Sequence, residues 1–131
     1  VRTSVSDLSK FFVCLLNSGK YNGARILKKR SVEEMLKFQY TASNKPENID
    51  LTETNSGIFW ATKAKTTRIG HGGADPGVKT EMLYDPTQKV GVILFTNTGL
   101  ADEDMFKNYY AIFDELWKHA ASLKDAKAIT H

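Results

Sequence analysis

One segment of the chain combines residue types that could do chemistry. Residues 68–77 read Arg-Ile-Gly-His-Gly-Gly-Ala-Asp-Pro-Gly. Glycines allow a backbone to be approached closely, or to adopt positive φ angles in a tight turn. By itself the segment fits either a glycine-rich hairpin turn with an incidental His71 or a backbone surface that a ligand approaches. A phosphate-binding loop is disfavoured, because no Lys-Ser/Thr pair and no helix follow the glycines.

The other residues that could bind metal form no ligand pattern. His71, His119 and His131 lie in unrelated settings, without a glutamate at helical spacing. The single cysteine, Cys14, falls in the apolar run 11–16, where we expect a small core residue. The sequence therefore predicts no metal site, and nothing in it indicates a cofactor.

Composition narrows the class of protein. The chain has 131 residues, of which 41% are hydrophobic and 25% charged, and a formal net charge of +3. These values are typical of a soluble globular domain, or of a piece of a larger one, and exclude disordered, collagen-like and disulfide-scaffold proteins. No apolar stretch approaches the ~18 residues that span a bilayer, and no charged-then-apolar leader opens the chain. The basic residues Arg25 and 28–30 predict a solvated turn, since no nucleic-acid-binding module accompanies them.

Three helices are expected from apolar periodicity. Ser4 and Asp7 have the spacing of a capping box ahead of a helix that Gly19 would close. Ser31 and Glu34 predict a second capping box before a short helix. A wide apolar stripe predicts a last helix that begins at residues 102–104 and frays after about residue 123.

The remaining pattern predicts strands on short connections. Tyr21-Asn22-Gly23 is typical of a turn, with a short paired segment on either side, and residues 41–56 form a polar loop. Strands are expected at 57–62, 66–70, 78–84 and 90–96, the last of them central because it is apolar on both faces. The fold class that follows is α+β: an antiparallel sheet of three to five strands, with the first and last helices packed on it.

The order of several segments is itself informative. Residues 3–8, 11–12 and 15–21 are followed by residues 26–35, which end on Ser-Val-x-x-Met. The most specific segment, Gly-His-Gly-Gly-Ala-Asp-Pro-Gly at 70–77, precedes Asp85-Pro86 and Thr96-Asn97. In this order and spacing the chain, over about residues 1–120, resembles the serine β-lactamase-related family. That family includes class C β-lactamases, penicillin-binding proteins (D,D-peptidases) and related esterases.

The resemblance implies roles for four residues. His71-Gly72-Gly73 takes the place of the third active-site motif of the family, a Lys or His, then a small residue, then Gly, on the strand that borders the cleft. His71 would support the substrate electrostatically, and Gly72 and Gly73 would bind it, Gly73 by letting it lie flat along the strand edge. The backbone N–H of Ala74 would be one of two oxyanion-hole donors. Gly72 departs from the family, which usually carries Thr or Ser there, and this favours an esterase-like or uncharacterised branch.

Two family motifs are missing. The family nucleophile lies in Ser-x-x-Lys, but none of the eight serines is followed by Lys three residues later. No Tyr-x-Asn or Ser-x-Asn occurs either. We therefore expect residues 1–131 to be the C-terminal segment of a larger β-lactamase-like domain. Such a segment would be inactive alone, within a parent that performs acyl transfer on a β-lactam, peptide or ester. The alternative is a non-catalytic binding or interaction module derived from the same fold.

Expectations about partners come from the same resemblance. The full-length protein would take a small-molecule or peptidoglycan-like substrate, in the periplasm or outside the cell. Within the family, strands from earlier in the chain complete the sheet. Their absence would leave a sheet edge open, and open edges pair with other chains, so we expect either a homodimer or an imperfectly covered sheet.

Overall fold

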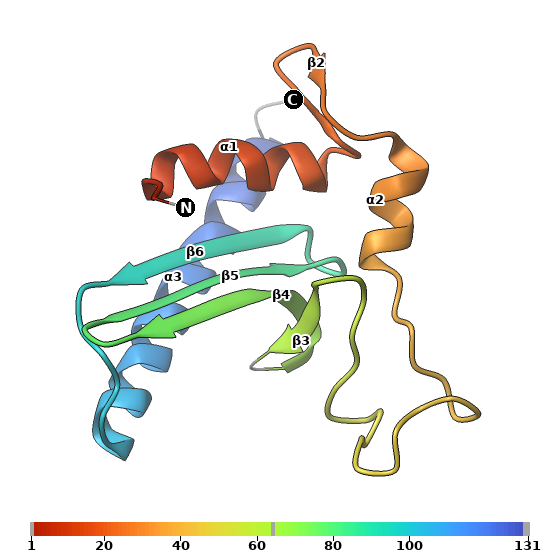
Figure 1. Cartoon of the computed structure of the whole chain (residues 1–131). Coiled ribbons are helices and arrows are strands. Elements are labelled where there is room, and N and C mark those ends of the chain that lie inside the picture. Colours follow the sequence, from red (N-terminus) through yellow and green to blue (C-terminus); the bar gives the residue numbers. More distant parts are fainter. Residues whose placement is uncertain (1, 64, 130–131) are drawn as a thin grey trace. The chain divides into compact units, whose positions relative to one another are not determined.

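The computed structural model describes residues 2–63 and 65–129. Within them it has three helices and six strands, which confirms the α+β class (Figure 1). The chain divides into two compact units, residues 1–66 and residues 67–131, and each is described by itself.

The first unit opens with helix α1 (Val5–Leu16). The predicted capping box is present at its start, because Ser4 Oγ accepts a hydrogen bond from the N–H of Asp7 at 3.0 Å. The C-cap is Asn17, earlier than expected. Gly19, with φ +82°, follows it and donates its N–H to the carbonyl of Cys14. Cys14 is 3% exposed, so its assignment to the core is confirmed.

The expected turn and second helix follow. Strands β1 (Lys20–Tyr21) and β2 (Ala24–Arg25) pair antiparallel around the Asn22-Gly23 turn. Helix α2 spans Lys29–Leu36. The capping box predicted at Ser31 is wrong, because the N-cap is Lys28, which has no side-chain cap bond, and Ser31 already lies inside the helix.

The strand expected at 57–62 is shorter than predicted and begins later in the chain. Only Ala61–Lys63 forms a strand, β3. Phe59 adopts a positive φ of 63° and is 82% exposed, which interrupts the extended backbone before it. Trp60 is buried and stacks on Phe12 of α1, with ring centroids 6.3 Å apart.

The second unit is built on three long antiparallel strands. They are β4 (Lys65–Asp75), β5 (Val78–Asp85) and β6 (Val90–Thr96), in a sheet of order β3-β4-β5-β6. Of the described strands, β6 is therefore at an edge, and the prediction that it is central is wrong. Its residues Val90 and Val92 are buried because a helix covers that face, which explains its apolar character.

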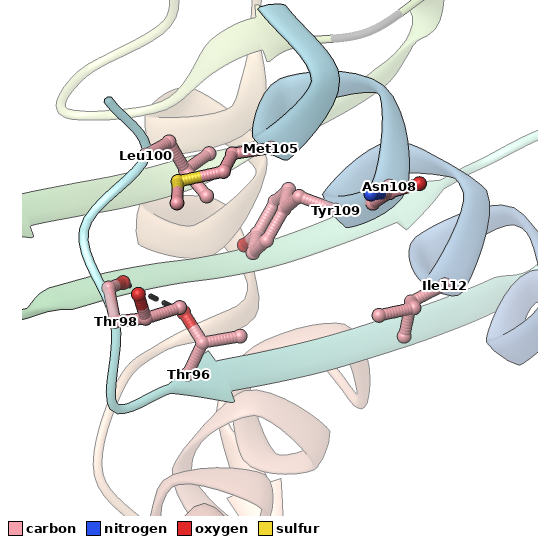
Figure 2. A pocket seen from close by; sticks show the side chains of 7 residues that line it. All are labelled: Thr96, Thr98, Leu100, Met105, Asn108, Tyr109 and Ile112. Atoms are coloured by element: carbon pink, nitrogen blue, oxygen red, sulfur yellow. Dashed lines mark hydrogen bonds between the residues drawn. The ribbon is translucent and has the colours of Figure 1, made fainter. Parts of the chain in front are cut away.

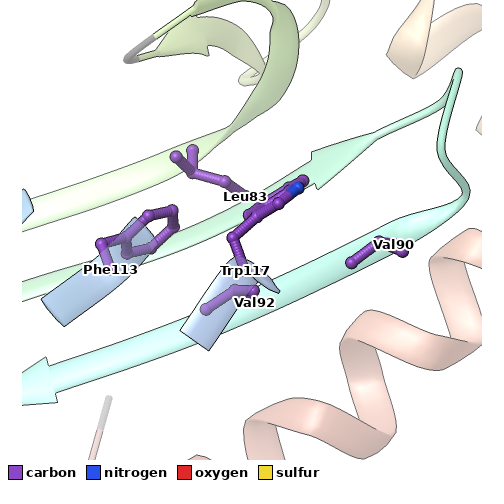
Figure 3. Packing of buried hydrophobic residues seen from close by; sticks show 5 residues of the cluster. All are labelled: Leu83, Val90, Val92, Phe113 and Trp117. Atoms are coloured by element: carbon purple, nitrogen blue, oxygen red, sulfur yellow. The ribbon is translucent and has the colours of Figure 1, made fainter. Parts of the chain in front are cut away.

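That helix is α3 (Glu103–Ile129), which continues beyond the end expected near residue 123. Asp102 caps its start by accepting the N–H of Met105 at 2.8 Å. Phe113 and Trp117 pack from α3 onto the sheet, and Figure 3 shows this core with its five members, Leu83, Val90, Val92, Phe113 and Trp117. The prediction that the last helix packs on the sheet is confirmed. The same prediction for the first helix concerns the placement of one unit against the other and stays a prediction.

Candidate functional site

His71, Gly72, Gly73 and Ala74 all lie on strand β4, in its last third. The register with β5 places them opposite Met82, Glu81, Thr80 and Lys79, respectively. The hairpin turn itself is confined to Pro76 and Gly77, the latter with φ +78°. The interpretation of the segment as a glycine-rich turn is therefore wrong, because the strand continues through the glycines to Asp75.

Successive residues of β4 direct their backbone N–H and C=O groups to opposite edges of the strand. Gly73 presents its carbonyl to β5, where Thr80 Oγ1 donates to it at 3.5 Å. The carbonyl of Lys79 instead faces β6, since it accepts from Thr96 Oγ1 at 3.0 Å. Successive residues of an antiparallel ladder point their N–H and C=O groups to opposite sides. The N–H of Ala74, opposite Lys79, is therefore directed away from β5, towards the other edge of β4.

The side chains divide between the two faces of the sheet. Leu83 belongs to the core beneath α3, so Glu81 and Lys79, two and four residues before it, lie on the same face. Gly72 is opposite Glu81 and shares that face. His71, opposite Met82, lies on the reverse face, where its side chain is exposed. Within the described residues its imidazole has no hydrogen-bond or ion-pair partner.

A buried charged cluster lies behind this strand, and the sequence pattern did not predict it. Glu81 is 2% exposed, and its Oε1 lies 3.3 Å from Lys79 Nζ and accepts from the Tyr110 hydroxyl at 3.4 Å. Oε2 of Glu81 and the buried hydroxyl of Tyr109 have no partner among the described atoms. The alternation of residue types along 78–84 indicates only that Lys79 and Glu81 share a face. The length and amphipathicity of the last helix were the signal that this face would be covered.

The buried carboxylate of Glu81 affects the pKa of both tyrosines. Burial raises the pKa of Tyr109, and the negative charge of Glu81 raises it further. Burial also raises the pKa of Tyr110, again with a contribution from Glu81. Both phenols therefore stay neutral across the physiological range and can act only as neutral hydrogen-bonding groups there.

Two pockets adjoin the end of the sheet. One, of about 410 Å³, is lined by Ala74 and Lys79 together with apolar side chains that include Val78 and Phe106. The other, of about 170 Å³, lies between the end of β6 and the first turns of α3 (Figure 2). Tyr109 points into the middle of the residues that line it, between Leu100 and Thr98 on one side and Ile112 on the other. Of the four residues expected at a site, Ala74 thus borders a hollow in the surface.

The described residues contain neither a metal-binding cluster nor a membrane-spanning helix. No group of three or more His, Cys, Asp or Glu side chains among them is placed to hold a metal ion. His119 is exposed on α3, and His131 lies outside the described residues. None of the described helices combines the length and apolarity needed to cross a membrane.

Comparison with known proteins places the chain in a family. A family model described as Beta-lactamase matches residues 1–116, which is most of the chain. The segment 70–77 and both flanking strands fall inside the match. No curated protein and no solved structure gives a significant match.

Proposed function

The chain belongs to the β-lactamase family, and from this premise we propose that it is the C-terminal segment of a serine hydrolase that performs acyl transfer. The observation that carries the proposal is the direction of the Ala74 N–H. It points away from β5, at a place where His71, Gly73 and Ala74 are all exposed. A backbone donor so placed can bind the oxygen of a substrate carbonyl.

The proposed chemistry assigns one task to each residue. A serine outside these residues attacks the substrate carbonyl carbon and gives its hydroxyl proton to a base, and the carbonyl oxygen gains negative charge in the tetrahedral intermediate that forms. When the leaving group departs with that proton, the carbonyl bond re-forms and the acyl group stays on the serine. The Ala74 N–H donates to that oxygen, a contribution commonly worth about 10²–10³ in rate. Gly73 has no side chain to obstruct a substrate lying along the strand, and His71 offers an exposed imidazole beside it. Water then releases the acyl group.

The nucleophile is the part that this chain does not supply. No Ser-x-x-Lys is present in the 131 residues, so we propose that this motif comes from an earlier part of a longer chain. In the described residues of the second unit, no loop or helix forms a backbone hydrogen bond with residues 70–75. That edge of β4 is therefore available for a substrate or a further segment within the unit.

An assay with two protein lengths tests the proposal. The 131-residue chain and the full-length gene product are compared on nitrocefin and on p-nitrophenyl esters. We expect turnover by the full-length protein and none by the chain alone. His71→Ala in the full-length protein should lower kcat while leaving the thermal midpoint unchanged, because the imidazole is exposed. Robust hydrolysis by the chain alone that disappears in its His71→Ala variant would contradict the assignment as an inactive segment.

A non-catalytic binding module is the second candidate, favoured by the absence of Ser-x-x-Lys and by Gly72 in place of a hydroxyl residue. The coding sequence before Val1 separates the two. An intact Ser-x-x-Lys there rejects the binding module, and a degenerate one favours it.

The same free edge supports a proposal about assembly. An unpaired strand edge offers N–H and C=O groups to a second chain. Because β3 has three residues, it can pair with only part of the eleven-residue β4, and we infer that the 131-residue chain dimerises through residues 70–75 of β4. Light scattering should give twice the monomer mass of 14.7 kDa. A monomer over the whole accessible concentration range would reject the dimer without affecting the catalytic proposal.

A further inference from the structure

We propose that helix α3 pairs with α3 of a second copy of this chain, side by side and antiparallel, through an apolar stripe on the helix surface. This surface is separate from the edge of β4. The inference goes beyond the proposed function and does not depend on it.

Helix α3 is apolar along two neighbouring stripes. The first includes Phe113 and Trp117 and is buried on the sheet. The second, called the outer stripe below, keeps between 37% and 53% of each apolar side chain exposed: Met105, Ile112, Leu116 and Leu123. These residues follow one another at steps of seven, four and seven, which are the steps between the a and d positions of a coiled coil. The outer stripe therefore has the pattern by which one helix packs on another.

A hollow of about 460 Å³ lies in the middle of the outer stripe. All the residues that line it belong to α3, and they include Ile112, Glu115, Leu116 and His119. These four are residues i, i+3, i+4 and i+7 of one helix face, the kind of four-residue hole into which a side chain of a facing helix inserts. In a symmetric pair centred on Leu116, the leucine of the second copy is the apolar side chain that reaches this hole.

The charges along α3 determine the direction of the pair. Residues 102–115 carry five acidic side chains and one basic one, a formal charge of −4. Residues 116–125 carry two basic side chains and one acidic one, a formal charge of +1. Parallel copies would place the two acidic halves side by side. Antiparallel copies place each acidic half beside the basic half of the other helix, and they also oppose the two helix dipoles.

The charged residues beside Leu116 fit the same arrangement. Glu115 and Lys118 form an ion pair within one helix, and both side chains are 71% exposed. A twofold axis beside Leu116 places residues before it in one helix opposite residues after it in the other. Glu115 of each copy is therefore within reach of Lys118 of the other. The same two side chains can form two symmetric ion pairs across the interface.

A cysteine at the centre of the outer stripe tests the pairing directly. Leu116→Cys in the 131-residue chain should form a disulfide between two copies under mild oxidation, because the axis brings the two cysteines together. Lys107→Cys is the control, since it is exposed on α3 but lies two residues after Met105 and so on a different side of the helix. The wild-type chain, whose Cys14 is 3% exposed, measures the background.

The molar mass gives a second readout. Leu116→Glu places two carboxylates at the centre of the pair, so the mass from light scattering should fall by half at the same concentration. This change is expected whether or not the copies also pair through β4. Val13→Glu is the matched control, because it makes the same kind of change at an apolar residue of α1 that is 46% exposed. Thermal midpoints show whether each variant keeps its fold.

Charge reversal tests the antiparallel direction. Glu115→Lys and Lys118→Glu each place like charges across the axis, so each should raise the dissociation constant of the pair about two- to fivefold, the range for exposed ion pairs. A mixture of the two variants restores opposite charges. Native mass spectrometry should then find mixed pairs in excess over either self-pair, and a statistical mixture would contradict the antiparallel arrangement.

The outcomes concern the outer stripe alone. A disulfide in Leu116→Cys, together with a mass that falls in Leu116→Glu and not in Val13→Glu, supports the inference. A monomeric wild type, an unchanged mass in Leu116→Glu, or no disulfide overturns it. If the disulfide forms in the 131-residue chain but not in the full-length protein, an earlier segment of the same chain covers the stripe there, and the second copy is overturned as its occupant.

Discussion

The guanidinium group of Arg68 lies over the indole ring of Trp117, with its central carbon 4.1 Å from the ring centroid. Arg68 Nη1 also lies 3.1 Å from Asp114 Oδ1, and the arginine side chain is only 7% exposed. Arg68 belongs to β4, three residues before His71, and both of its partners belong to α3. These contacts anchor the strand that carries the candidate site onto the helix behind it.

Arg68→Lys should therefore destabilise the protein although it keeps the charge. Lysine lacks the planar group that stacks on an indole and the fork that holds a carboxylate. We expect a loss of about 1–2 kcal/mol in the free energy of unfolding, the range of a desolvated cation–π contact. Urea denaturation followed by tryptophan fluorescence measures it. Arg30→Lys, on the exposed start of α2, is the matched control, and an equal loss in both variants would contradict the anchoring role.

The lowered pKa of the Asp85 carboxylate predicts that the free energy of unfolding falls at acidic pH. This carboxylate is 4% exposed, and burial alone would raise its pKa. Hydrogen bonds from the Thr87 hydroxyl, the N–H groups of Thr87 and Gln88, and the Thr67 hydroxyl outweigh burial, so the pKa is lowered. A lowered folded-state pKa stabilises the protein above the unfolded-state value of about 3.9. This contribution is lost as the pH falls from there through the folded-state pKa.

Asp85→Asn tests this directly. At pH 7 it should cost about 1–3 kcal/mol, the usual penalty for weakening hydrogen bonds to a buried group, and the slope of stability against pH below 5 should become shallower. Asp50→Asn is a close control, because Asp50 accepts the same pair of bonds from Thr52, at 2.8 and 2.7 Å, on the exposed surface. If the two variants behave alike, burial of Asp85 is not what makes its bonds matter.

The glycine run shows why the local sequence pattern did not predict the conformation of residues 70–75. Clustered glycines with Pro76 are typical of turns, and the local pattern carries no information about what lies across the strand. The structure shows that Gly70 is required by a close approach, since its Cβ would overlap the Met82 carbonyl. The requirement for glycine is set by the partner strand β5 and not by positive φ. Turn composition was therefore a poor guide to the length of β4.

Glu81 shows that strand periodicity does not predict which face of a strand is buried. The alternation of residue types along β5 indicates that Lys79 and Glu81 share one face, and a charged face is usually the solvated one. The burial of that face depends on α3, whose Tyr109 and Tyr110 surround the carboxylate. A contact between residues 29 positions apart cannot be derived from strand periodicity alone. The fold class and the helices, by contrast, depend on local period and were predicted.

Leu83 should be the most sensitive apolar position in the second unit. It is fully buried between Phe113 and Trp117 (Figure 3). Leu83→Ala should cost about 2–5 kcal/mol, the range for a buried leucine that leaves a cavity. Leu116→Ala on α3 removes the same atoms from a side chain that is 37% exposed, so its loss should be clearly smaller. Chemical denaturation of both variants measures the difference, and similar losses would place the core elsewhere.

Gly70→Ala should disrupt the β4–β5 ladder itself. The added Cβ would overlap the Met82 carbonyl and lie 2.9 Å from Leu83 Cα, both of them backbone atoms that a rotamer change cannot move. Gly73→Ala adds the same atom where its nearest neighbour is Thr80 Oγ1, at 3.3 Å, a hydroxyl that can rotate away. We therefore expect Gly70→Ala to lower stability by several kcal/mol, as large clashes in packed regions do, and Gly73→Ala by about 1 kcal/mol or less. Amide hydrogen exchange along residues 69–75 should accelerate in the first variant only. Equal protection in the two variants would show that the strands can separate at Gly70 without cost.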